Sequence, residues 1–146
     1  VLAFGRLNWE KGVDRLIATG REAQARMRQA GTPVVVPAAS TTDRSAIMFQ
    51  VPYYTERDRG LIPEWDNRFD VGSWEGWLTY HPLDRAAQVG TKPVSIVHSE
   101  AAAIPDGAKR FHAALTGPKR QLWLDGVTQF DFYDRDEPVT RAADFT

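Results

Sequence analysis

The sequence predicts an α/β fold, in which parallel strands are flanked by helices. Between Pro93 and Thr146, apolar runs of strand length alternate with helical patterns in the order strand, helix, strand, helix. This alternation is typical of a parallel sheet whose strands are connected through helices. Ahead of it lie one long helical pattern and a stretch, residues 37–92, where the periodicity weakens and aromatic residues concentrate.

The first element is a helix over residues 10–29. Its apolar side chains recur at spacings of three and four, with arginine and glutamate between them, as in an amphipathic helix. Gly31 and Pro33 end it in the usual order, with glycine just past the last turn and proline soon after. The apolar run Val34–Val36 that follows is extended, but it is bounded by prolines and is too brief to predict as a central strand.

Residues 37–92 are predicted to form a lid-like insertion. Long loop-rich stretches inside compact domains are usually functional, and the many aromatic side chains argue against disorder. Four of these side chains are candidates for lining an apolar substrate pocket beneath a lid, namely Tyr53, Tyr54, Trp65 and Trp74. The alternative is that they pack the insertion onto the sheet.

The last part of the chain supplies a βαβα unit. Val94–His98 is a compact apolar run bounded by turn signals, which predicts a buried parallel strand. A helix over Pro105–Leu115 follows, with proline at its first position, and Gly117 marks its end. Arg120–Leu124 is the second predicted strand, and Asp136 begins the last helix with acidic residues in its first turn.

The composition disfavours several classes of partner. The formal net charge is −1 and the lysines and arginines are scattered, so nothing favours nucleic acid or an anionic membrane surface. No apolar run approaches the roughly 20 residues that cross a bilayer. The chain has no cysteine, and its three histidines lie in different elements without metal-ligand spacing. We therefore expect a cytoplasmic protein that binds a small molecule, with no cofactor, metal, nucleic acid or membrane partner.

The C-terminal third resembles a known family. The segments PVSIVHSE at Pro93–Glu100 and GPK…LWLDGVTQFDFYD at Gly117–Asp134 are similar to the end of an α/β hydrolase, most of all the bacterial branch near the dienelactone hydrolases and peptidase-like esterases. The resemblance implies the C-terminal part of that fold. Residues 1–146 would form a single partial domain, with the insertion at about 37–92 and the βαβα unit at 93–146.

In that family the triad acid follows the penultimate strand and the triad histidine follows the last strand. Here Gln129 stands at the histidine position and Ala102 at the usual aspartate position, while Glu100 offers a carboxylate from the same turn. Glu100 and Gln129 are therefore the candidate catalytic residues, and both should lie at one edge of the sheet, close enough to share a pocket. The alternatives are a surface carboxylate and an amide that caps a turn.

The nucleophile of that family is not found in this chain. A G-x-S-x-G elbow would expose it above the sheet, but Gly72-Ser73-Trp74 lacks both the second glycine and a preceding strand. Because the nucleophile precedes the acid and the histidine in chain order, its place would be upstream of Val1. We expect the chain to be part of a longer polypeptide, or to associate as a homodimer or with a companion N-terminal segment.

Three hypotheses for function follow. The first is an α/β-hydrolase-fold enzyme acting on an ester, lactone or similar carbonyl substrate, and the second is a hydrolase-fold protein that binds ligands without catalysis. The third is a fragment of a GT-B glycosyltransferase, because Phe4–Leu7 and Lys11-Gly12 resemble its nucleotide-sugar half and Glu56 and Glu64 reproduce an E-x₇-E spacing. Those glutamates lie beside proline without a following strand, which weighs against the third hypothesis.

Overall fold

The computed structural model describes residues 9–146, and these divide into two compact units with the boundary between Tyr80 and His81. The glycosyltransferase-like motif at Phe4–Leu7 lies outside the described residues. The expected single domain with an insertion at 37–92 stays a prediction, because the positions of the two units relative to one another are not determined.

Helix α1 (Trp9–Ala30) begins the first unit and confirms the predicted amphipathic helix. It ends where Gly31 adopts a φ of 69°, a left-handed conformation that glycine reaches without steric cost. The helix packs on α2 (Trp74–Thr79) and the short 3-10 helix η2 (Val71–Ser73). Ala23 of α1, Val71 and Trp74 form the buried core of this contact.

Short strands complete the first unit. Strand β1 (Val35–Pro37) pairs antiparallel with β4 (Arg68–Asp70), whereas β2 (Ala39–Ser40) and β3 (Met48–Phe49) pair in parallel. The 3-10 helix η1 (Pro52–Tyr54) follows β3. Between residues 40 and 67 regular structure is sparse, and side-chain hydrogen bonds of Ser40, Asp43 and Asn67 hold parts of this segment.

The second unit is the predicted βαβα unit, preceded by the 3-10 helix η3 (Pro82–Val89). Strands β5 (Val94–His98) and β6 (Lys119–Trp123) pair in parallel, with Val94 opposite Lys119 and His98 opposite Trp123. Helix α3 (Pro105–Ala114) connects them, and α4 (Asp131–Asp134) and α5 (Asp136–Phe145) follow β6. The parallel pairing of the two strands is thus confirmed.

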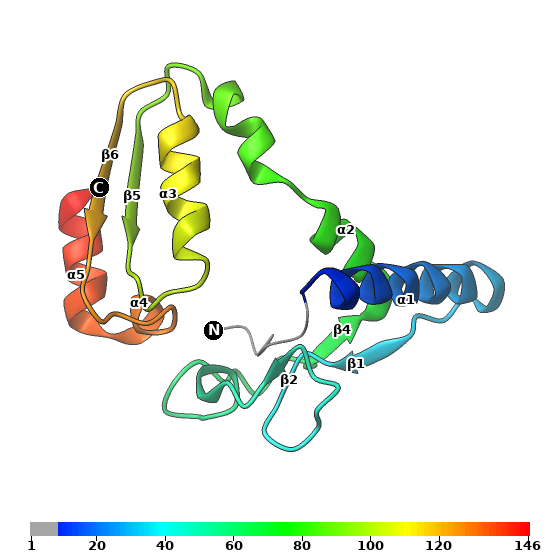
Figure 1. Cartoon of the computed structure of the whole chain (residues 1–146). Coiled ribbons are helices and arrows are strands. Elements are labelled where there is room, and N and C mark those ends of the chain that lie inside the picture. Colours follow the sequence, from blue (N-terminus) through cyan, green and yellow to red (C-terminus); the bar gives the residue numbers. More distant parts are fainter. Residues whose placement is uncertain (1–8) are drawn as a thin grey trace. The chain divides into compact units, whose positions relative to one another are not determined.

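The two strands of the second unit are covered by helices. Helix α3 contacts β5 and β6, while α5 contacts β5, and Figure 1 shows these helices on opposite sides of the strands. Leu124, just past β6, is 1% exposed, and Ser99, just past β5, is fully buried. The carboxyl ends of the strands are therefore anchored in the core. None of the helices in the described part of the chain is long and apolar enough to span a bilayer.

Candidate functional site

The candidate site lies at the carboxyl ends of β5 and β6. Because these strands are parallel, the turns that follow them leave the same end of the sheet. The Leu124 N–H donates to the carbonyl oxygen of His98 at 2.8 Å, so the two strands stay paired up to the point where they turn away. Ligands of open α/β sheets bind outside such strand ends. Glu100 follows the first strand and Gln129 the second.

Gln129 connects the two turns. Its Oε1 accepts a hydrogen bond from the backbone N–H of Ala103 at 3.3 Å, and its Nε2 donates to the hydroxyl of Tyr133 at 3.0 Å. Ala103 is the neighbour of Ala102, the position that resembles the triad aspartate. The Gln129 amide therefore joins the turn that follows β5 to the segment that follows β6. A neutral amide orients its partners, but it does not take up and return a proton near pH 7.

Glu100 is held as an anion by α3. Its carboxylate accepts a hydrogen bond from Lys109 Nζ and forms an ion pair with it, while 61% of the Glu100 side chain remains exposed. The hydrogen bond from Lys109 is the main cause that lowers the pKa of Glu100 below its ordinary value, and the positive charge of Lys109 adds to it. Slight burial opposes this shift. Glu100 is therefore suited to attract or orient a positive group, not to donate a proton.

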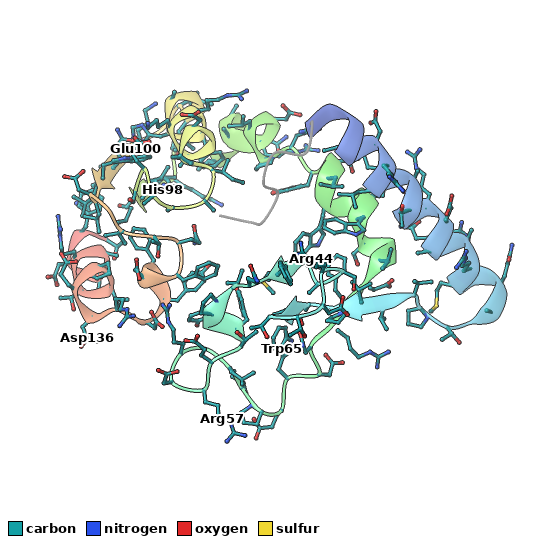
Figure 2. The ribbon with its side chains drawn as sticks, turned by 60° about the horizontal axis from the view of Figure 1, so that its bottom comes forward. Arg44, Arg57, Trp65, His98, Glu100 and Asp136 are labelled. Carbon is teal, nitrogen blue, oxygen red and sulfur yellow. The ribbon has the colours of Figure 1, made fainter. Side chains whose placement is uncertain are left out.

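His98 is part of a ring stack on the sheet. Its imidazole stacks on Trp123 with ring centroids 5.1 Å apart and an interplanar angle of 23°. His98 Nδ1 lies 2.9 Å from the carbonyl oxygen of Ser99, so this nitrogen carries the proton and donates it. Lys109 Nζ lies 5.1 Å from the centre of the Trp123 ring, within the range of a cation–π contact. His98 is thus a half-buried, hydrogen-bonded histidine next to the Glu100 turn (Figure 2).

The turn between β5 and α3 contains a strained residue that the sequence analysis missed. Ile104 adopts a φ of 56° and a ψ of 53°, the left-handed region that β-branched residues avoid, and it is 69% exposed. Such strain recurs at functional sites, where the surrounding structure enforces it. The signal in the sequence is Pro105, because the residue before a proline is biased away from the right-handed helical region. Ile104 follows Ala103, whose N–H donates to Gln129.

The four candidate pocket residues lie in the first unit, which contains α1 and α2. Tyr54 contacts Tyr53 with ring centroids 5.0 Å apart and Trp65 with centroids 6.0 Å apart, so these three residues form one aromatic cluster. Trp74 packs instead against Phe69 at 5.1 Å and is 7% exposed in the core beneath α1. It also lines a cavity of about 420 Å³ in this unit. The described ring contacts do not place Trp74 in the tyrosine cluster.

The part of the chain that the structure describes contains no set of side chains that could hold a metal ion. No group of three or more histidine, aspartate or glutamate side chains converges there. His81 is exposed, whereas His112 is half-buried in α3, with its Nε2 inaccessible to solvent. The chemical groups of the strand-end site are therefore one exposed carboxylate, one fixed amide and one stacked imidazole.

Comparison with solved structures assigns the architecture. The hypothetical protein PA2218 from Pseudomonas aeruginosa matches with a TM-score of 0.68 and 23% identity over 90% of this chain and 43% of that chain. The α/β hydrolase GrgF from Penicillium sp. sh18 matches with a TM-score of 0.65 and 19% identity over 94% of this chain and 49% of that one. The fold is that of an α/β hydrolase.

A third solved structure that matches this chain is that of DcsB in complex with its substrate analogue. It has a TM-score of 0.66 and 15% identity, and it covers 90% of this chain and 48% of that one. The chain thus spans about half the length of each of these structures, which is consistent with the predicted C-terminal part of the fold. No protein-family model and no curated protein matches this chain.

Proposed function

We propose that this chain is the C-terminal part of a protein that acts on an ester, lactone or similar carbonyl substrate, in the manner of the dienelactone-hydrolase and esterase branch. The hydrolase-like fold and the position of Glu100 and Gln129 after adjacent parallel strands support the proposal. A serine or cysteine nucleophile would come from outside this chain, at an elbow whose backbone N–H groups stabilise the oxyanion.

The observation that carries the proposal is the hydrogen bond from Ala103 N–H to Gln129 Oε1, which joins the turns after β5 and β6. In the proposed site, Gln129 positions the turn and offers hydrogen bonds, and Glu100 supplies a fixed negative charge. Neither residue replaces the general base, so a proton acceptor must also come from outside the two turns. Tyr53, Tyr54 and Trp65 are the proposed apolar substrate contacts of the first unit. Trp74, the fourth candidate, is buried in the core of that unit.

A ligand-binding protein without catalysis is the second candidate function. It is favoured by the same amide, because both polar ends of Gln129 already have partners and neither titrates. Such a protein keeps the pocket of the fold and lacks the proton-transfer step of the hydrolases.

Labelling of the complete gene product with a fluorophosphonate probe separates the two candidates. An enzyme with an activated serine reacts covalently, and the labelled peptide should map outside residues 1–146. It should also turn over a simple aryl ester. A complete product that neither reacts nor turns over esters, but binds a carbonyl ligand, supports the binding protein.

The 146-residue chain alone should have negligible esterase activity, because Gln129 cannot act as a general base and no nucleophile elbow is present in its sequence. The measurement is the rate of 4-nitrophenyl acetate hydrolysis above the buffer rate. Turnover that disappears when one serine of this chain is replaced by alanine would overturn the proposal of an external nucleophile.

A further inference from the structure

The cavity of the first unit lies between α1 and the segment that leads into β3. Its volume is about 420 Å³, within the usual range for small-molecule sites. The apolar part of its wall comes from Leu16, Ile47, Phe49 and Trp74. Trp74 and the neighbouring Ala46 are each 7% exposed, so the floor of the cavity belongs to the packed core.

Two positively charged side chains line this apolar cavity. Arg15 of α1 and Arg44 both line it, and both side chains are exposed. Neither guanidinium forms an ion pair with any of the residues that the structure describes. No carboxylate is among the lining residues. The lining therefore combines an apolar wall with two positive charges that form no ion pair with a described acidic side chain.

The segment that carries Arg44 is held by its own hydrogen bonds. Ser40 Oγ accepts from the backbone N–H of Asp43 at 2.9 Å, and Asp43 Oδ1 accepts from the backbone N–H of Ser45 at 2.8 Å and from its hydroxyl at 2.7 Å. These bonds from Ser45 lower the pKa of Asp43, so this carboxylate is satisfied by Ser45. The Arg44 guanidinium lies 5.3 Å from the centre of the Phe49 ring, on the wall of the cavity.

The two hydroxyl groups of the lining are already engaged. The Thr19 hydroxyl donates to the Arg15 carbonyl oxygen at 2.9 Å, and the Ser45 hydroxyl donates to Asp43. The two guanidinium groups are thus the charged donors of the described lining that can meet a ligand. Because a guanidinium fork matches the two oxygens of a carboxylate, these donors favour a carboxylate over a neutral ligand.

We propose that this cavity binds an organic carboxylate with an apolar body, such as a medium-chain acyl or an aryl carboxylate. The apolar body lies against Phe49 and Trp74, and the carboxylate is bound by Arg15 and Arg44. The cavity belongs to the first unit and the strand-end site to the second, and this proposal does not depend on the carbonyl chemistry proposed for the second unit.

The test is calorimetric titration of the 146-residue chain with octanoate and 2-naphthoate, next to the neutral octanamide. Both carboxylates should bind with a Kd of about 1 mM or lower, and octanamide should bind at least about tenfold more weakly because it lacks the charge. Arg15→Gln and Arg44→Gln together should weaken octanoate binding by about tenfold or more. Added salt should weaken it as well, because both charges are exposed.

Arg57→Gln is the matched control, because this exposed arginine lies on the loop after η1 and does not line the cavity (Figure 2). It should leave octanoate binding unchanged. Thr19→Phe, at an exposed helix position of the lining, should block binding without removing a charge. Absence of binding by both carboxylates, equal binding of octanamide, or an unchanged Kd in the double arginine variant would each overturn the proposal.

Discussion

At the scale of single residues, Lys109 sets the charge state of Glu100. Replacing Lys109 by methionine removes the hydrogen bond and the positive charge that lower the pKa of this carboxyl group. The pKa should then rise towards its ordinary value, as measured by carboxyl chemical shifts in an NMR pH titration. Lys92→Met is the control, because Lys92 is exposed and has no ion pair among the described residues. An unchanged titration of Glu100 in Lys109→Met would contradict this ion pair.

The sign of the pH dependence follows from the direction of this shift. A carboxyl group with a lowered pKa in the folded protein stabilises the fold above its ordinary pKa. That contribution is lost as the pH falls through the lowered pKa of Glu100. In Lys109→Met the free energy of unfolding should therefore fall less steeply as the pH is lowered. At alkaline pH its dependence on pH should be the same as in the unaltered chain. The effect is small, because the Glu100 side chain is 61% exposed.

Gln129 is predicted to contribute to stability through its two hydrogen bonds. Gln129→Leu removes the acceptor of the Ala103 N–H and the donor to Tyr133, and should lower the free energy of unfolding by about 1 kcal/mol. Urea unfolding measures this change, with the exposed Gln88→Leu as control. A loss in the control as large as in Gln129→Leu would instead indicate a general cost of exposing leucine.

The position of Glu100 and Gln129 after two parallel strands could be predicted from sequence, but their hydrogen-bond partners could not, and their role in a site stays a prediction. Glu100 and Gln129 follow apolar runs of strand length, and parallel pairing brings such ends together. The choice of Lys109, Ala103 and Tyr133 as partners depends on the path of each turn. The left-handed Ile104 sets one of these paths, and the sequence shows only the bias imposed by Pro105.

At the scale of elements, the helix and strands with clear periodicity were predicted and the short strands were not. Helix α1, strands β5 and β6, and helix α3 lie within a few residues of their predicted bounds. Strands β2 and β3 have two residues each, too few for a repeating pattern. Their neighbourhood is held by Asn67, whose Oδ1 accepts from Ala39 N–H at 2.7 Å and whose Nδ2 donates to the Ala39 carbonyl oxygen at 2.9 Å.

Asn67→Ala should destabilise the first unit. The change removes both hydrogen bonds to Ala39 and leaves an alanine at a φ of 51°, so we expect a loss of about 2 kcal/mol. Tryptophan fluorescence during urea unfolding reports on this unit through Trp65, Trp74 and Trp77, and Trp123 adds a signal from the second unit. Gln50→Ala is the matched control, because Gln50 also has a positive φ, of 55°, but forms no described side-chain hydrogen bond. Equal losses in the two variants would assign the effect to the backbone alone.

Lys119 caps the carboxyl end of α3. Its Nζ donates to the carbonyl oxygens of His112 at 2.8 Å, Ala113 at 3.1 Å and Leu115 at 2.9 Å. A positive charge at this end also complements the helix dipole. Lys119→Met should cost about 1 kcal/mol and speed amide hydrogen exchange in the last turn of α3. Unchanged exchange at Leu115, with Lys92→Met as control, would contradict the cap.

At the scale of the whole molecule, the division into two units follows from a contact that periodicity cannot reveal. The insertion at 37–92 stays a prediction, and the structure adds that Val71 and Trp74 of this stretch pack against Ala23 of the preceding helix α1. A helical pattern shows which face of α1 is apolar, but it does not identify the residues that cover that face. The second unit was easier to predict, because its contacts join neighbouring elements in the chain.

The sheet of the second unit leads to the last prediction. Parallel sheets normally have several strands and bury both faces, whereas β5 and β6 form a two-stranded sheet among the described residues. The Val94 N–H donates to Pro118 and the His98 carbonyl oxygen accepts from Leu124, so alternate residues of β5 point their backbone groups towards β6. Ser95 and Val97 therefore direct theirs to the other edge of β5, which pairs with no other strand among the described residues.

Unpaired backbone groups on an apolar edge strand favour pairing with another chain. We expect the 146-residue chain to form a homodimer through this edge, or to require a companion polypeptide that supplies the next strand. Sedimentation velocity at micromolar concentration measures the dimer. Val97→Pro removes an outward N–H without breaking a bond to β6, so it should shift the dimer to monomer. A well-folded monomer of the unaltered chain would contradict the association, and a dimer that persists in Val97→Pro would place the interface elsewhere.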